Sequence, residues 1–391
     1  MLCSGTGFSK NRNAEAAARE ASAQALEKAG QTASRAALVF ASYEHRDHYP
    51  EILREVRRVT QAEHVIGSSA YGVMTESSEL ENRHAVAVMA VHCDDDAFAS
   101  LMASDLQESN FRAGEKAAKT LAHSGFHPSS LVLLADPFSF QSHHFFEGLE
   151  SVLGYLPITG GLSSENGRDG KTFQMAGGRL AFDSAALLAL GETLRAETAM
   201  ARSCQPFGDP VQITKAEGNL IYEMDGRPAY DMLLESISQT PIESTDHLTQ
   251  RVFLGIPVRS FQTDFVNSPY LIRNLMGINE KKGLLTCVSP VPEGEFVTFA
   301  CQDPEFARQS LKEVLDDMRE RILPGKPAFG LYFNSCARGS RLYGQRQVDI
   351  RMIRDAFPDT PILGFFGYGE IAPVDFVNHL HHYSGVLTLV S

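Results

Sequence analysis

The sequence predicts an α/β protein of two lobes, built from repeated strand-helix-strand-strand modules whose mixed sheets are flanked by helices. Three observations support this prediction. A glycine-containing motif recurs along the chain, apolar runs typical of buried strands precede and follow each copy, and a segment with helical periodicity lies between the first run and the motif. Because such a module cannot bury its faces alone, we expect the copies to pack together.

The motif is clearest in two stretches. Residues 65–74 read VIGSSAYGVM and residues 362–371 read ILGFFGYGEI, so that glycine, tyrosine and glycine recur at one constant spacing. A looser third copy, PITGGLSSENG, occupies residues 157–167. The apolar runs before the copies are residues 36–43, 130–137 and 328–335, and those after them are residues 85–91, 186–192 and 385–391.

Residues 203–249 do not follow this pattern. SCQPFGDP has the prolines and glycine of a linker, and the next segment predicts a strand, a turn at Asp225–Gly226 and a helix after Pro228. Residues 304–323 form the clearest amphipathic helix of the chain. The predicted domains are therefore residues 1–205, a linker and junction strand at residues 206–224, and residues 225–391.

Composition and charge limit the possible partners. The chain has 391 residues with a formal net charge of −13, and such an acidic protein repels phosphate backbones, so we expect no nucleic-acid partner. The densest basic run, from Arg338 to Arg354, is interleaved with acids and indicates a solvated surface with one possible anion site. No apolar stretch predicts membrane insertion, no signal peptide is evident, and the six scattered cysteines favour a reducing cytoplasm.

Four segments, in this order along the chain, resemble the FIST family with its paired FIST N and FIST C domains: VIGSSAYG with PITGGLSS, MDGRPAYDML, NSCARG and GYGEIAP. The resemblance covers essentially the whole chain, with residues 1–205 FIST N-like and residues 225–391 FIST C-like. It implies a small-ligand sensory module for signal transduction, with an amino acid as the ligand. Because no kinase, cyclase or F-box-like segment is evident, we expect a stand-alone sensor that acts through a separate signalling protein.

Glu370 is the first candidate ligand-binding residue. It ends a glycine-punctuated strand, and Gly369 beside it lets backbone and ligand approach closely. Its carboxylate could accept a hydrogen bond from a ligand ammonium group, and Tyr368 could donate one. A strand-end glutamate that faces water is the competing interpretation. The ligand-site hypothesis requires that Glu370 and Arg338 turn inward around the space that the glycines leave open.

Cys336, Arg338 and Gly339 follow the buried run 328–335, where an α/β sheet commonly binds its ligand. Gly339 allows a tight turn, and Arg338 could bind a carboxylate or phosphate and lower the pKa of the Cys336 thiol. A small buried cysteine is the alternative. No known catalytic motif occurs, and a phosphatase loop would need arginine where residue 342 is leucine, so we expect no enzyme. An enzyme with Cys336 as nucleophile and a scaffold without a ligand remain alternatives.

The first lobe has a counterpart of this site. Its glycine turns could form an anion nest, with plain turn chemistry as the alternative. The residues concerned are Gly67, Ser68, Ser69, Gly160 and Gly161, together with Ser163 and Ser164. FIST N domains often carry an acid where this chain has Val73 and Met74. If that acid contacts the ligand elsewhere in the family, the first-lobe site is altered or absent here.

Histidines cluster only at His143–His144 and in HLHH at residues 379–382, without the acids or cysteines of a metal site, so we expect no metal. Some bacterial FIST proteins are associated with haem and nitric oxide sensing. The resemblance therefore makes haem a possible cofactor and a haem-based nitric oxide sensor the second functional hypothesis. No residue stands out as an axial ligand.

Overall fold

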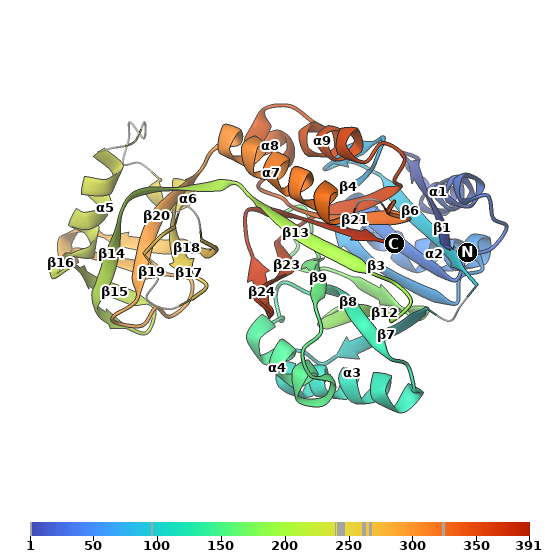
Figure 1. The fold of residues 1–391 in the computed structure, drawn as a ribbon, viewed down its shortest axis with the longest axis horizontal. Coiled ribbons are helices and arrows are strands. Elements are labelled where there is room, and N and C mark those ends of the chain that lie inside the picture. Colours follow the sequence, from blue (N-terminus) through green and yellow to red (C-terminus); the bar gives the residue numbers. More distant parts are fainter. Residues whose placement is uncertain are drawn as a thin grey trace. The chain divides into compact units, whose positions relative to one another are not determined.

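A computed structural model describes residues 2–94, 97–238, 240, 247–259, 263–265, 268–322 and 325–391 (Figure 1). The chain forms two compact units. The first comprises Met1–Ala201, Leu311–Leu380 and Ser384–Ser391, and the second comprises Arg202–Ser310 and His381–Tyr383. The last 80 or so residues of the chain therefore belong mainly to the same unit as its first half.

Three repeats build the first unit. The first repeat contains β1 (Leu2–Ser9), α1 (Ala14–Ala29), β2 (Ala36–Ser42), α2 (Tyr49–Thr60), β3 (His64–Ala70) and β6 (Val86–Cys93). The second contains β7 (Phe98–Ser104), α3 (Asn110–Ser124), β8 (Pro128–Ala135), α4 (Ser142–Leu153), β9 (Ile158–Leu162) and β12 (Ser184–Gly191). The third contains β13 (Ala196–Arg202), α7 (Pro304–Ile322), β21 (Phe329–Ser335), α9 (Val348–Ala356), β22 (Ile362–Gly367) and β25 (Ser384–Val390). In the chain, the second unit interrupts the third repeat between β13 and α7.

Strand pairing is the same in all three repeats, which confirms the predicted module. The central strands β2, β8 and β21 each pair in parallel with the glycine strand that follows, namely β3, β9 and β22. Each central strand also pairs antiparallel with the last strand of its own repeat, namely β6, β12 and β25. Helical crossovers make the parallel pairs possible, because parallel strands need a long connection.

The repeats also exchange strands in a closed cycle. After the glycine strand, each chain segment crosses into the sheet of another repeat. β4 (Gly72–Thr75) pairs with β22 of the third repeat, β10 (Gln174–Ala176) pairs with β3 of the first, and β23 (Gly369–Val374) pairs with β9 of the second. The hairpin partners β5 (Glu79–Glu81), β11 (Arg179–Ala181) and β24 (Val377–His381) complete three sheets of six strands with equivalent strand order.

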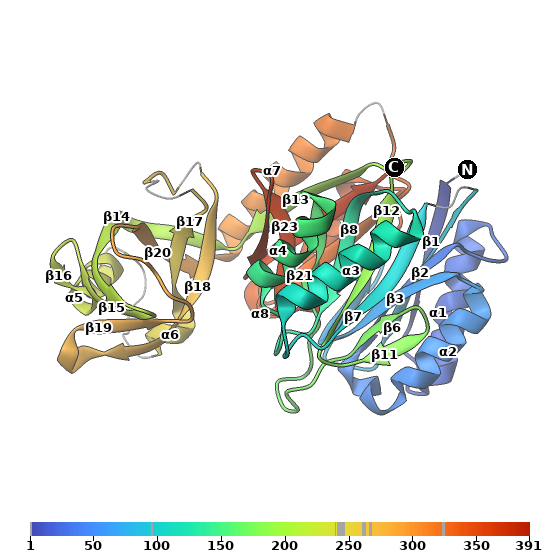
Figure 2. The ribbon, with the colours of Figure 1, turned by 90° about the horizontal axis from the view of Figure 1, so that it is seen from below.

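One apolar core lies among the three sheets. Phe40 of the first sheet packs against Phe333 and Phe365 of the third, with ring centroids 6.4 and 4.6 Å apart, and Val132 and Leu134 of the second sheet join the same cluster. Helix pairs cover the opposite face of each sheet. Figure 2 shows α3 and α4 along the sheet that contains β7, β8 and β12, and their apolar side chains form a separate cluster with it.

A glycine stands at the same place in each repeat because the neighbouring strand leaves no room for a Cβ atom. A Cβ atom on Gly67 would lie 2.4 Å from the carbonyl oxygen of Val39. On Gly160 and Gly364 the corresponding distances, to the carbonyl oxygens of the opposing residues in β8 and β21, are 1.9 and 2.2 Å. At these three positions glycine therefore allows close strand packing. At Gly67 and Gly160, backbone occupies the space where the sequence analysis placed a candidate anion nest.

The second unit is a small antiparallel barrel. Its strands are β14 (Cys204–Glu217), β15 (Leu220–Met224), β16 (Arg227–Pro228), β17 (Val252–Pro257), β18 (Tyr270–Asn279), β19 (Leu284–Cys287) and β20 (Phe296–Gln302). Pairing between β14 and β15 closes the ring through β20, β17, β18 and β19. Closure removes exposed sheet edges. Residues 206–224, predicted as a linker and junction strand, thus lie mostly in β14 and β15.

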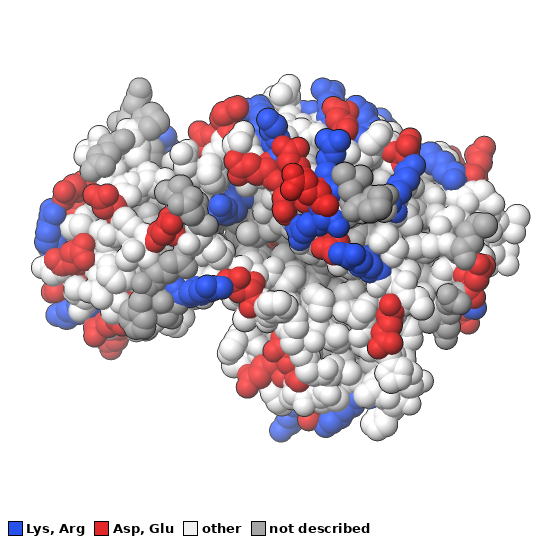
Figure 3. Space-filling view, viewed as in Figure 1, with Lys and Arg blue, Asp and Glu red and all other residues white. Residues whose placement is uncertain are grey.

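Local predictions in this part of the chain agree with the structure. A turn at Asp225–Gly226 joins β15 to β16, both turn residues having positive φ, and α5 (Ala229–Ser238) begins after Pro228. The predicted helix 304–323 is α7. Figure 3 shows acidic and basic side chains interspersed over this part of the surface. Among the described residues, no helix combines the length and the apolar character needed to cross a membrane.

Replacing Gly364 by alanine tests the role of the repeated glycine. A Cβ atom there also meets Met74 Cγ at 2.9 Å, so Gly364→Ala should lower the free energy of unfolding by about 2 kcal/mol or more. Urea unfolding followed by circular dichroism measures this. Gly277→Ala in strand β18 is the control, because the nearest atom to its Cβ lies 3.7 Å away. Equal midpoints for the two variants would contradict this explanation.

Candidate functional site

The third repeat carries buried polar side chains where the other two repeats are apolar. The residues opposite the repeated glycine are Val39, Leu133 and Tyr332, in the order of the repeats. Two positions later on the same strands are Ala41, Ala135 and Asn334. Tyr332 and Asn334 are buried. Burying polar groups costs free energy unless they are hydrogen-bonded, so a specific partner must hold them.

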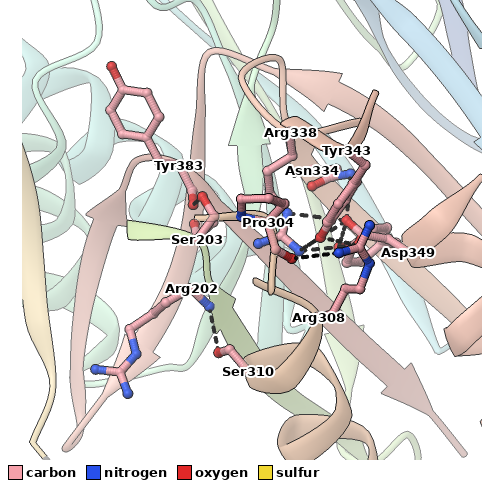
Figure 4. Close-up of polar contacts among 12 residues, drawn as sticks. Arg202, Ser203, Pro304, Arg308, Ser310, Asn334, Arg338, Tyr343, Asp349 and Tyr383 are labelled. Carbon is pink, nitrogen blue, oxygen red and sulfur yellow. Dashed lines mark hydrogen bonds and ion pairs between the residues drawn. The ribbon is translucent and has the colours of Figure 1, made fainter. Parts of the chain in front are cut away.

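That partner is Asp349, in the first turn of α9. Its Oδ2 accepts hydrogen bonds from Tyr332 Oη at 2.9 Å, from Asn334 Nδ2 at 3.1 Å and from Arg338 Nε at 3.1 Å. Its Oδ1 accepts from Arg338 Nη2 at 3.2 Å and from Tyr343 Oη at 2.7 Å (Figure 4). We call these five residues, Tyr332, Asn334, Arg338, Tyr343 and Asp349, the Asp349 cluster.

Arg338 is the largest buried side chain of the cluster, with no exposed surface. Burial opposes its charge, but the Asp349 carboxylate, with Tyr332 and Tyr343, outweighs burial and raises the pKa of Arg338 above its ordinary value. Burial, the negative charge of Asp349 and its hydrogen bond likewise raise the pKa of Tyr332. The cluster therefore holds one buried cation on one buried anion, with the tyrosines as neutral donors.

Three buried polar atoms in this region have no hydrogen-bond partner among the described residues: Arg338 Nη1, Asn334 Oδ1 and Glu370 Oε1. Asn334 and Arg338 both donate to Asp349 Oδ2, so their end groups lie within one hydrogen bond of the same atom. A buried polar group left unpaired costs about 1–3 kcal/mol. Arg338 Nη1 and Asn334 Oδ1 belong to residues that meet at Asp349, and Glu370 Oε1 lies elsewhere at the same end of the third repeat; each atom would be stabilised by a polar ligand or an ordered water.

Glu370 lies in the exchanged strand β23, opposite Gly161 of the second repeat, and is fully buried, so it does not face water. Its Oε2 accepts from the backbone N–H of Ser384 at 3.2 Å and from Ser384 Oγ at 2.7 Å. Burial raises the pKa of Glu370 to about 8, although the Ser384 hydrogen bonds and the charge of Arg338 lower it. Near neutral pH the carboxyl group is therefore mostly protonated.

The loop over the cluster is held by two carboxylates of β5. Glu81 accepts from Ser340 N and from Ser340 Oγ, both at 3.0 Å, at the start of α8 (Gly339–Tyr343). Glu79 Oε1 accepts from the backbone N–H of Gln347 at 2.9 Å. Burial raises the pKa of Glu79 to about 7, and the charges of Glu81 and Asp349 add to this, while the Gln347 hydrogen bond opposes it. Residues 336–347, which we call the α8 loop, thus rest on a strand of the first repeat.

Gly339 is required in this loop for two reasons. Its φ of +60° lies in the left-handed region, and a Cβ atom would lie 2.8 Å from the Phe366 ring. The predicted tight turn after Arg338 is therefore present, and it packs directly on the glycine strand β22.

Cys336 and Tyr368 differ from their predicted roles. Burial raises the pKa of the Cys336 thiol above its ordinary value; the nearby Glu370 and Glu81 add to the effect, and Ser164 opposes it. The expectation that Arg338 lowers this pKa does not hold, because the guanidinium is engaged by Asp349. Tyr368 Oη donates to Glu165 Oε1 at 2.8 Å, and burial together with that carboxylate raises the tyrosine pKa.

Cysteine and tyrosine are two of the residue types that serve as axial ligands of haem. As axial ligands, cysteine binds as a thiolate, and tyrosine is suited to this role as a phenolate. The pKa values of Cys336 and Tyr368 are both raised, so both groups stay protonated near neutral pH. Iron would have to displace these protons, so neither side chain is a preformed axial ligand, and among the described residues no group of three or more histidine, cysteine or acidic side chains is placed to hold a metal ion.

The serines of the first-lobe turns lie inside the protein and are engaged with one another. Ser68 Oγ donates to Ser163 Oγ at 2.7 Å, and Ser69 Oγ donates to the backbone oxygen of Ser164 at 3.2 Å. Ser164 Oγ accepts from Tyr71 N at 2.7 Å and donates to the backbone oxygen of Phe366. The turns of all three repeats therefore meet at one junction, and these serines join the strands together.

The remaining predicted glycines belong to the same junction. Gly369 pairs with Leu162, and a Cβ atom on Gly161 would lie 3.2 Å from the backbone oxygen of Gly369. The structure thus brings together the turns at residues 67–69, 160–164 and 367–370, close to Cys336, whose backbone N–H donates to the oxygen of Gly367 at 2.9 Å. The unpartnered groups, however, belong to Asn334, Arg338 and Glu370.

Sequence reasoning did not identify Asp349, Asn334, Tyr343 or Ser384. One signal was available, because an asparagine inside the apolar run AFGLYFNS must be buried with a partner. Asp349 gave no signal of its own, since an acid in the first turn of a helix is common and usually interacts with the helix dipole.

Comparisons with known proteins agree with the order of the motifs. The model of the FIST N domain matches residues 35–227, and the model of the FIST C domain matches residues 229–373. An uncharacterized protein of Mycobacterium tuberculosis is 29% identical over 392 residues, with 98% of each chain covered. An uncharacterized protein of Mycobacterium bovis is 27% identical over 391 residues, again with 98% of each chain covered. An uncharacterized protein of Methanocaldococcus jannaschii is 24% identical over 217 residues, which cover 54% of this chain and 40% of that protein.

Asp349→Asn tests the buried ion pair. The variant leaves the Arg338 charge buried without a counter-charge, so we expect a loss of about 3–5 kcal/mol in the free energy of unfolding, measured by urea denaturation. Asp359→Asn is a matched control, because Asp359 forms an exposed ion pair with Lys326 at 3.0 Å, and such a pair contributes about 1 kcal/mol or less. Similar losses in the two variants would show that the cluster carries no special stability.

Glu370 should make stability depend on pH. Its pKa is about 8 in the folded protein against an ordinary value of 4.5, so the folded state binds the proton more tightly and stability falls as pH rises between these values. Between pH 5.5 and pH 8.5 the free energy of unfolding should fall by on the order of 3 kcal/mol because of this group. Glu370→Gln, which resembles the protonated form, should remove this part of the slope.

The measurement is the free energy of unfolding of both proteins at several pH values. Glu147→Gln on α4, an exposed glutamate, should keep the wild-type slope and serves as the control. Equal slopes for wild type and Glu370→Gln would show that Glu370 is ionised in the folded protein.

Proposed function

Because the chain belongs to the FIST family through its FIST N and FIST C domains, which form a sensory-type module, we propose that it senses an amino-acid-like ligand and signals through a separate protein. The ligand binds beneath the α8 loop, beside Asn334, Arg338 and Glu370. The observation that carries this proposal is the set of three unpartnered buried atoms on these residues.

The chemistry of the three atoms matches the two ends of an amino acid. Arg338 Nη1 is an N–H donor on a permanent cation and suits the ligand carboxylate. Asn334 Oδ1 and Glu370 Oε1 are oxygens that can accept hydrogen bonds from the ligand ammonium group. Charge-assisted hydrogen bonds of this kind are roughly twice as strong as neutral ones. A ligand with only one of the two charges would leave at least one of these groups unpaired.

Protonation of Glu370 keeps the unliganded site neutral at this position. An unpaired buried carboxylate is costly, and a raised pKa avoids that cost. A ligand ammonium group beside Glu370 lowers the pKa again, because an opposite charge favours the ionised form. Binding near neutral pH is therefore coupled to release of a proton, and affinity increases as pH rises toward 8.

Ligand access and signal involve the α8 loop. Arg338 and Glu370 have no exposed surface, so a ligand reaches them only when the loop leaves β5, where Glu79 and Glu81 hold it. Ligand binding changes the position of the loop only if the two positions bind the ligand unequally. The signalling partner would read the position of α8 and of the following helix α9.

We propose that the protein is a sensor and not an enzyme. The residue proposed as an alternative nucleophile, Cys336, has a raised thiol pKa, and a thiol of this kind is a poor nucleophile near neutral pH.

A thermal-shift and calorimetry screen of the twenty amino acids tests the proposal. At 100 times Kd, a ligand should add about 2.7 kcal/mol to the free energy of unfolding. For a ligand that binds, the same compound with its carboxylate amidated should bind at least 10-fold more weakly, because Arg338 loses its partner. Glu370→Gln should weaken binding at least 10-fold, and Glu147→Gln should not.

Calorimetry in two buffers of different ionisation enthalpy gives the number of protons released. At pH 7 we expect the wild-type protein to release up to one proton for each ligand that binds. We expect Glu370→Gln to release none. No shift with any amino acid at millimolar concentration, or equal binding by both variants, would overturn the assignment of this ligand class.

A further inference from the structure

A cavity in the first unit is lined almost entirely by basic and polar side chains. It has a volume of about 820 Å³, which is within the range of small-ligand sites. The cavity opens to solvent, and six of its lining residues are exposed cations: Lys10, Arg12, Arg46, Arg83, Arg168 and Arg346. Glu44 is the one acid in the lining and Leu80 the one apolar residue. We call this the basic cavity.

These cations are largely uncompensated. Arg46 forms an ion pair with Asp169 at 3.3 Å. Within the described part of the chain, the other five cations of the cavity have no carboxylate partner within ion-pair distance. Such a concentration of positive charge is unexpected in a chain with a net charge of −13. Like charges repel, and the walls of a cleft focus their field on the space between them.

The cations come from five separate places in the sequence. Lys10 and Arg12 follow β1, Arg46 follows β2, Arg83 lies between β5 and β6, Arg168 follows β9, and Arg346 precedes α9. All three repeats thus contribute, and no local sequence run explains the convergence. The basic run noted from the sequence supplies Arg346 alone.

Two further polar atoms at the cavity lack partners. His84 Nδ1 and Asn166 Oδ1 are buried and have no hydrogen bond among the described residues, and both side chains line the cavity. Asn166 can turn its amide to present either its oxygen or its NH₂ group, and His84 can donate from Nδ1. With its amide turned so that the NH₂ group faces the cavity, Asn166 joins His84 as an uncharged donor beside the charged groups.

We infer that the basic cavity binds a small molecule that carries two or more linked phosphate groups. Guanidinium groups present paired N–H donors that match phosphate oxygens, and one phosphate cannot reach arginines spread over a cavity of this size. Two linked phosphates distribute their charge over several of the cations. This site is distinct from the proposed amino-acid site, and its residues do not include the Asp349 cluster or Glu370.

Isothermal calorimetry with inorganic pyrophosphate at 150 mM NaCl, without divalent cations, tests the inference on the full chain. Pyrophosphate should bind at least 10-fold more tightly than inorganic phosphate or citrate. Arg83→Gln combined with Arg168→Gln should weaken pyrophosphate binding at least 10-fold. The control Arg319→Gln with Arg354→Gln changes the net charge equally, lies outside the cavity, and should change affinity less than 2-fold.

Four outcomes would overturn the inference: no pyrophosphate binding up to 5 mM, equal loss in both double variants, citrate or phosphate as tight as pyrophosphate, or a single-stranded oligonucleotide tighter than pyrophosphate. Glu370→Gln should leave pyrophosphate binding unchanged. Because that variant affects only the amino-acid site, the two proposals succeed or fail separately.

Discussion

The cyclic exchange of strands among the three repeats is the constraint on which the rest of the structure depends. Each exchanged strand, β4, β10 or β23, completes the sheet of another repeat and carries one residue, Val73, Ala176 or Ala372, into the common apolar core. No repeat can leave the assembly without breaking two sheets. The first unit therefore behaves as one folding unit, although its sequence reads as three similar modules.

Exchange also explains why the candidate site needs more than one repeat. The Asp349 cluster belongs to the third repeat, but Glu79 and Glu81, which hold the α8 loop over it, come from the first. Glu370, in the exchanged strand β23, pairs with Gly161 in strand β9 of the second repeat. The repeated glycine fixes the same backbone packing three times, and this leaves the neighbouring positions free to differ. Two repeats use them for apolar packing, whereas the third places a buried ion pair there, an arrangement more easily explained by a specific task than by stability.

The sequence predicts those features that depend on local pattern. The strand and helix of each module, the helix at residues 304–323 and the turn at Asp225–Gly226 follow from periodicity and turn chemistry, because these record local burial and backbone conformation. Glu370 and Arg338 are both buried, as the ligand-site hypothesis requires, but they do not enclose a space left open by the repeated glycines, because neighbouring backbone fills it. The role of the repeated glycines was misread, because a glycine that admits a ligand and one that admits a neighbouring carbonyl have the same sequence pattern.

Partners that are distant in sequence could not be found in this way. Strand exchange leaves no local trace, and the second unit separates β13 from the rest of its repeat by about one hundred residues. Tertiary structure likewise brings Arg338 to Asp349, and it brings together the arginines of the basic cavity. Each residue alone resembles an ordinary surface charge in the sequence, and only burial and distance distinguish it.

The α8 loop connects the two sites in a physically specific way. Arg346 lines the basic cavity, the next residue, Gln347, donates its backbone N–H to Glu79, and Asp349 follows two positions later as the centre of the buried cluster. Within residues 346–349, Arg346 thus lines the basic cavity, Gln347 contacts a carboxyl group whose pKa is about 7, and Asp349 forms the buried ion pair. Distance alone does not couple two sites; coupling requires that each ligand binds the alternative positions of one shared element with unequal affinity. The α8 loop is the element shared by the two sites, because two carboxylates hold it on β5 and Asp349 holds Arg338 against α9. If both ligands bind, any coupling between them must act through this loop or through the packing beneath it, and by linkage it must be equal in both directions.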